Sequence, residues 1–99
     1  MIKVSIKKTK EKIQEITIDG HALYDDFGKD IVCASVSSIV ITTVNAIFMI
    51  DKDAINYEDK PSFKIKILKE NEIINKLVLN MINLLKELEK DYPKNIKFL

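Results

Sequence analysis

The feature that most constrains the fold is an uncharged stretch of twenty residues, from Ile31 to Ile50. Strands seldom exceed about ten residues, so this length predicts a helix although Ile, Val and Thr favour strands. Its apolar side chains recur at steps of three and four, the period of one helical face. A bilayer span has the same length, but six hydroxyl and amide side chains interrupt the stretch. We therefore expect a buried helix and no membrane partner.

The segments around this helix predict a small sheet and a second helix. Alternation of apolar and polar residues predicts a hairpin over residues 2–8 and 12–19 and two strands over 54–58 and 62–68. Residues 70–91 have an amphipathic helical pattern, and Ile96 and Phe98 predict a closing strand. The order ββ-α-ββ-α-β predicts an α+β, two-layer sandwich of about five mostly antiparallel strands with two helices on one face. We expect residues 1–99 to form a single domain.

The composition excludes some classes of function. All sixteen basic residues are lysines, and fifteen acids leave a net charge of +1. A nucleic-acid-binding protein normally carries an arginine-rich basic patch, so we expect no direct contact with nucleic acid. The single cysteine allows no internal disulfide, so nothing in the chain requires an oxidising compartment. We expect the protein to be cytoplasmic.

The residues with the most distinctive chemistry lie together in the sequence. The only histidine, His21, and the only cysteine, Cys33, share one short segment with the only two glycines, Gly20 and Gly28. Residues 22–29 have the composition of a loop, and Asp30 is predicted to cap the following helix. Cys33 is then expected in the first helical turn. There the free amides, the helix dipole and a nearby imidazolium would favour a thiolate.

This arrangement predicts nucleophilic acyl transfer. The thiolate of Cys33 would attack a carbonyl carbon, backbone amides would bind the oxyanion, and His21 would protonate the leaving amine. A lone cysteine is also often a small buried apolar residue. A redox-sensing thiol is a third reading, but no second cysteine could resolve a sulfenic acid. One cysteine and one histidine are too few for a structural zinc site, so we expect neither metal nor cofactor.

Other residues of the segment have two readings each, and both stay open. Asp30 either orients His21 or only caps the helix. Tyr24 and Phe27 either line a pocket for aromatic side chains or anchor the loop on the core. Ser37 and Ser38 either contact the substrate, or they satisfy backbone groups or admit close packing. The two glycines meet backbone requirements.

The same segment resembles the signature of a known family, the ribosomal-processing cysteine proteases, Prp. The resemblance rests on Gly20-His21-Ala22, Tyr24, Gly28, Asp30-Ile31-Val32-Cys33-Ala34 and Val36-Ser37-Ser38. It extends over nearly the whole chain, through Thr42 and Asn45 to Asp91-Tyr92-Pro93. Two departures are minor: Ser35 replaces an alanine common in the family, and the region of Pro61-Ser62 lacks the family's usual glycine.

The resemblance implies a specific function. Members of the family are cysteine endopeptidases that remove the short N-terminal extension of large-subunit ribosomal protein number twenty-seven, cleaving after an aromatic pair. By motif position, Cys33 would be the nucleophile and His21 its base and proton shuttle. Gly20 and Gly28 would be hinges of a cover loop. The partners implied are the ribosomal protein precursor and a second copy of the chain, as a homodimer. The alternative is a non-enzymatic ribosome-assembly or peptide-binding module.

Overall fold

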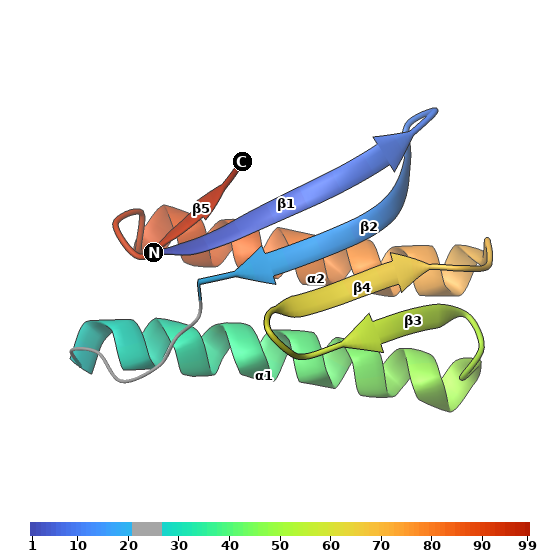
Figure 1. The fold of residues 1–99 in the computed structure, drawn as a ribbon, viewed down its shortest axis with the longest axis horizontal. Coiled ribbons are helices and arrows are strands. Elements are labelled where there is room, and N and C mark those ends of the chain that lie inside the picture. The colour runs from blue at the N-terminus through green and yellow to red at the C-terminus, as the bar shows by residue number, and fades with distance from the viewer. Residues whose placement is uncertain (21–26) are drawn as a thin grey trace.

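The computed structural model describes residues 1–20 and 27–99, with only the backbone for residues 27–30. These residues form five strands and two helices in the predicted order. The strands are β1 (Ile2–Thr9), β2 (Lys12–Asp19), β3 (Ile55–Glu58), β4 (Phe63–Ile67) and β5 (Ile96–Phe98). The helices are α1 (Phe27–Ile50) and α2 (Glu72–Asp91), and Figure 1 shows both running along the length of the sheet.

The sheet has the strand order β3-β4-β2-β1-β5. Three of its four pairings are antiparallel, and the fourth joins β1 to the C-terminal β5 in parallel. The register between β1 and β2 shifts between Lys7 and Lys8, which places a bulge near the hairpin turn. The mostly antiparallel sheet confirms the predicted α+β class.

One face of the sheet is buried and the other is not. Ile2 and Val4 of β1 and Ile16 and Ile18 of β2 are buried, whereas Lys3 between them is exposed. Side chains alternate between the faces of a strand, so the helices cover the same face. Between the layers lies one continuous core, to which both helices and every strand contribute.

Side-chain caps hold α2 and the C-terminal strand in place. The Oδ1 atom of Asn71 accepts hydrogen bonds from the backbone amides of Ile73 and Ile74, at 2.9 and 3.1 Å. This cap starts α2 at Glu72, two residues after the predicted boundary. Near the other end, Oε2 of Glu89 accepts a 2.7 Å hydrogen bond from the amide of Phe98. The last turn of α2 therefore anchors β5 beside β1.

The start of α1 differs from the prediction. The helix begins at Phe27, so Asp30 is its fourth residue and not its N-cap, and residues 27–29 are helical and not part of a loop. Gly28 therefore lies in the first turn of the helix and not in the predicted loop. One glycine costs a helix only about 1 kcal/mol, which a helix of 24 residues tolerates. Acidic residues are favoured both at the N-cap and in the first helical turn. Asp30 is therefore compatible with a helix that begins at residue 27 as well as with one that begins at residue 31.

The long apolar segment is buried on one face only. Val32, Val36, Val40, Val44 and Ile47 follow the spacing of one helical face and lie in the core. The opposite side of α1 is exposed, including Ile41 and Met49. By length and hydropathy, Ile31–Ile50 would pass as a membrane span, with 33% of its most apolar window buried within the protein. The expectation of a buried helix holds for the inner face and is wrong for the outer one.

Candidate active site

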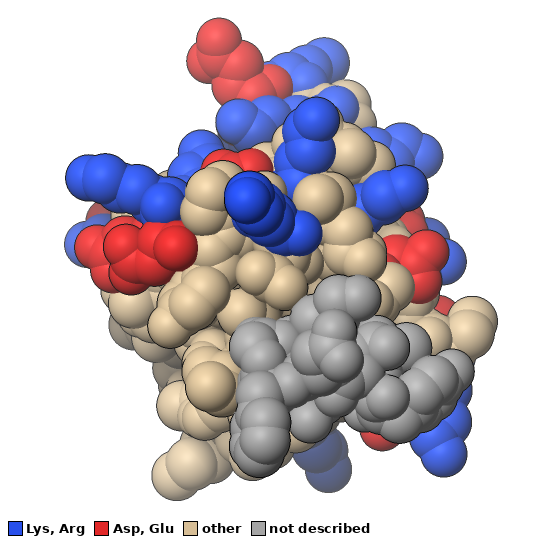
Figure 2. All heavy atoms as spheres, turned by 90° about the vertical axis from the view of Figure 1, so that its left-hand side faces the viewer, with Lys and Arg blue, Asp and Glu red and all other residues tan. Residues whose placement is uncertain are grey.

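Cys33 lies on α1 near the end of the molecule at which β2 stops and the helix begins. Its side chain is half-buried and packs against the core, so it is not sealed within it. Figure 2 views the molecule from this end and shows lysines gathered mainly over its upper half, where β1 and β2 lie. A thiol placed at this border between core and surface can meet a substrate from solution.

The position of Cys33 along the helix corrects one part of the predicted mechanism. Counted from Phe27, Cys33 is the seventh helical residue and lies in the second turn. The effect of the helix dipole falls off within the first turn. The prediction that Cys33 occupies the first turn, and that its free amides favour the thiolate directly, is therefore wrong. The predicted activation of Cys33 then depends more on the predicted imidazole partner.

The other predicted site residues divide into three groups. His21 and Tyr24 lie outside the described residues, as does the loop up to residue 26. For Phe27 and Asp30 the structure describes a helical backbone and no side chain. Ser37 follows Cys33 by four residues and so shares its helical face, half-exposed.

Ser38 is separated from this pair. It is exposed and lies on the outer side of α1. The structure thus brings Cys33 and Ser37 together and leaves Ser38 on another face. Among the side chains that the structure describes, in residues 1–20 and 31–99, no group of three or more His, Cys, Asp or Glu that could hold a metal ion is found.

Gly20 has the backbone role that the sequence indicated. Its φ is +80°, in the region that L-residues rarely adopt, and its amide donates to Oδ1 of Asp19 at 2.9 Å. A Cβ atom at this position would stand 2.4 Å from the carbonyl oxygen of Met1. Only glycine meets both conditions without strain. This turn ends β2 directly before His21.

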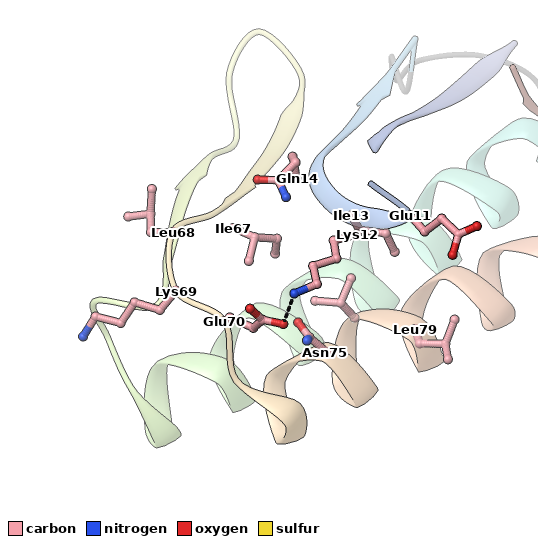
Figure 3. A pocket seen from close by; sticks show the side chains of 11 residues that line it. Glu11, Lys12, Ile13, Gln14, Ile67, Leu68, Lys69, Glu70, Asn75 and Leu79 are labelled. Carbon is pink, nitrogen blue, oxygen red and sulfur yellow. Dashed lines mark hydrogen bonds and ion pairs between the residues drawn. The ribbon is translucent and has the colours of Figure 1, made fainter. Parts of the chain in front are cut away.

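A second feature, which the sequence analysis missed, lies at the other end of the molecule. A groove of about 430 Å³ is lined by the start of β2, the segment after β4 and the first turns of α2. Figure 3 shows Lys12 of β2 reaching across it to Glu70, beside Asn75 of α2. The lining comes from three segments distant in sequence, so no local motif could indicate the groove.

The fold and the half-buried thiol together define a small α+β domain with its single cysteine on the longer helix. Comparison with known proteins identifies this class. A family model described as cysteine protease Prp matches residues 1–97. A relative from Staphylococcus aureus named ribosomal processing cysteine protease Prp is 35% identical, over 98% of this chain and 96% of its own. A Bacillus subtilis relative of the same name is 27% identical, over 98% and 95%.

Solved structures agree with the sequence comparison. The Staphylococcus aureus processing protease Prp in complex with a substrate peptide superposes with a TM-score of 0.87 at 31% identity, covering 100% of this chain and 98% of the other. The same protease with a covalently linked product peptide gives a TM-score of 0.83 at 33% identity, covering 99% and 97%. The chain belongs to the Prp family of cysteine proteases. The prediction of an enzyme is thereby confirmed over that of a non-enzymatic binding module.

Proposed function

We propose that this protease removes the N-terminal extension of large-subunit ribosomal protein number twenty-seven, cleaving after an aromatic pair. The observation that carries the proposal is the match of the family model over residues 1–97, which includes the whole segment from Gly20 to Ser38. The names of the relatives, which specify ribosomal processing, support this class of substrate. Ribosomal proteins join ribosomes in the cytoplasm, so we propose the same location for the enzyme.

The catalytic roles follow from the chemistry of a cysteine protease. Such an enzyme needs a thiol nucleophile, and Cys33 is the only cysteine in the chain. The structure of a relative with a covalently linked product peptide supports an acyl-enzyme pathway. In this pathway the sulfur of Cys33 attacks the scissile carbonyl, and His21, the only histidine, takes the thiol proton and later gives it to the leaving amine. Water then releases the acyl group.

The direct test uses the unprocessed ribosomal protein from the same organism. The purified protease is incubated with it, and the intact masses of the products are measured. We expect one cut, after an aromatic pair, by the wild-type protein. Cys33→Ala and His21→Ala should each abolish the cut while circular dichroism stays unchanged, and Ser38→Ala should retain it. An intact precursor after incubation with wild-type enzyme would overturn the proposed substrate.

We also propose that the protein is a homodimer. An uncharged, exposed stripe on α1 supports this. We term it the outer stripe, and it comprises Ile31, Ala34, Ser38, Ile41, Asn45 and Phe48. These residues follow steps of three and four, the spacing of a helix-packing seam. Ile31 is 54% and Ile41 45% exposed, and apolar patches of this kind are typical of interaction surfaces. Two copies packed along this stripe would meet no like charges.

Light scattering after size exclusion tests the dimer. We expect the wild-type protein to elute as a dimer and Ile41→Glu to elute as a folded monomer, because the new carboxylate would be buried without a partner. Leu99→Glu is the matched control, since Leu99 is exposed but lies at the C-terminus, away from α1. A monomeric wild-type protein at micromolar concentration would contradict the proposal.

A further inference from the structure

The groove far from Cys33 has the features of a binding site for an extended polypeptide. Its apolar surface comes from Ile13, Ile67 and the buried Val78, with the exposed side chains of Leu68 and Leu79 at its rims. Its volume of about 430 Å³ lies within the usual range of ligand-binding clefts. The charges at its mouth are balanced, because Lys12 pairs with Glu70, so the groove selects neither a cation nor an anion.

The sheet has an open strand edge at this groove. Strand β2 pairs with β1 from Lys12 onward, but with β4 only from Glu15 to Ile18. Beyond that point the chain after β4 turns away, and the amide of Leu68 donates to the carbonyl oxygen of Ala54 at 2.8 Å. Within the described residues, β2 therefore has no neighbour on this side from residue 12 to residue 14. An open edge of this kind pairs with the main chain of an added strand.

Two amide side chains complete the match to a polypeptide main chain. Gln14 comes from β2 and Asn75 from α2, and both line the groove (Figure 3). Neither side chain forms a hydrogen bond with any residue that the structure describes. A side-chain amide has an acceptor oxygen and a donor NH₂ group, so it can pair with both the N–H and the C=O of a peptide group. A small anion or a metal ion could bind such amides but would leave the apolar surface of the groove unused.

We infer that the groove is a second peptide-binding site, which holds a segment of the substrate downstream of the cleaved bond. The inference rests on the proposed function. In the proposed substrate the chain after the cut is much longer than the extension before it, so this downstream chain is the part that can span a molecule 39 Å long. About ten extended residues cover roughly 33 Å. Binding there raises the effective concentration of the scissile bond at Cys33 and explains how the enzyme selects one protein.

The test compares two substrates. One is the full unprocessed ribosomal protein, and the other is a peptide that ends two residues after the cleaved bond. The double variant Gln14→Ala/Asn75→Ala removes both amides, and Asn80→Ala/Asn83→Ala removes two exposed amides of α2 outside the groove. We expect the groove variant to raise KM for the full protein about tenfold at unchanged kcat and to cleave the short peptide normally. The control should match wild type on both.

A binding measurement separates this inference from the proposed function. A twelve-residue peptide from the start of the mature ribosomal protein is titrated into ¹⁵N-labelled enzyme. We expect shifts in the amide signals of Ile13, Gln14 and Ile67, and their loss in the groove variant. Equal effects of that variant on both substrates, or no effect on either, would overturn the groove site. If wild-type enzyme cleaves neither substrate, the proposed function fails, and the titration alone decides whether the groove binds this chain.

Discussion

The turn at Gly20, which directly precedes His21 in the sequence, offers the sharpest prediction. Gly20→Ala places an L-residue at φ +80° and a Cβ atom 2.4 Å from the carbonyl oxygen of Met1. The left-handed conformation costs roughly 1–2 kcal/mol. Relief of the contact requires the first strand to shift, which adds about 1–3 kcal/mol, as for an overpacked core. We expect the free energy of unfolding to fall by about 2–5 kcal/mol.

Urea denaturation followed by circular dichroism measures this change. A domain of this size is stable by about 5–15 kcal/mol, and a typical slope is about 1–3 kcal/mol per molar urea. With a slope of about 2 kcal/mol per molar, the midpoint for Gly20→Ala should therefore fall by about 1–2.5 M. Without urea, folded Gly20→Ala should still cleave the substrate more slowly than wild type, because the displaced turn directly precedes His21.

Two further variants serve as controls for this reasoning. Gly20→Asn should lose less stability, because Asn adopts positive φ more readily, although its Cβ makes the same contact with Met1. Gly28→Ala should gain about 0.5–1 kcal/mol, since Gly28 lies within α1. A Gly20→Ala protein within 0.5 kcal/mol of wild type would refute the argument. So would a Gly28→Ala protein that is destabilised as strongly as Gly20→Ala.

Three other outcomes follow from the packing and the charges. Leu85 of α2 is fully buried, so Leu85→Ala should lower the free energy of unfolding, measured by urea denaturation, by about 2–5 kcal/mol. Asn71→Ala removes the cap of α2 and should cost about 1 kcal/mol by the same assay. The Asp53 amide and the Lys69 ammonium lower the pKa of Asp51 below its ordinary value of 3.8. The folded state thus favours the carboxylate, so Asp51→Asn should be less stable than wild type near pH 6. This difference should disappear as the pH falls through the lowered pKa.

Local patterns predicted most of the fold correctly. The alternation around Val4 and Ile18 identified the hairpin because only one sheet face is buried. The segment from Ile31 to Ile50 was too long for a strand, and α2 carries a regular apolar face. These features depend on neighbours within a few residues, which the sequence displays directly.

The parts that were missed depend on contacts between distant segments. The sequence could not indicate that α1 begins at Phe27, because one early glycine is tolerated once the helix packs on the sheet. The same uncharged composition suits a buried face and an exposed one, so the outer stripe looked like core. The groove joins β2, the segment after β4 and α2, which only the folded topology brings together.

The central claim is that the sulfur of Cys33 forms the covalent bond to the substrate, and a mechanism-based probe tests it most directly. A peptide with the aromatic pair at its C-terminus, carried as a chloromethyl ketone, is incubated with the enzyme, and the labelled fragment is located by mass spectrometry. We predict one adduct per chain, on Cys33, with its rate reduced at least a hundredfold in His21→Ala. If the Cys33→Ala variant still cleaves the substrate, the account is contradicted.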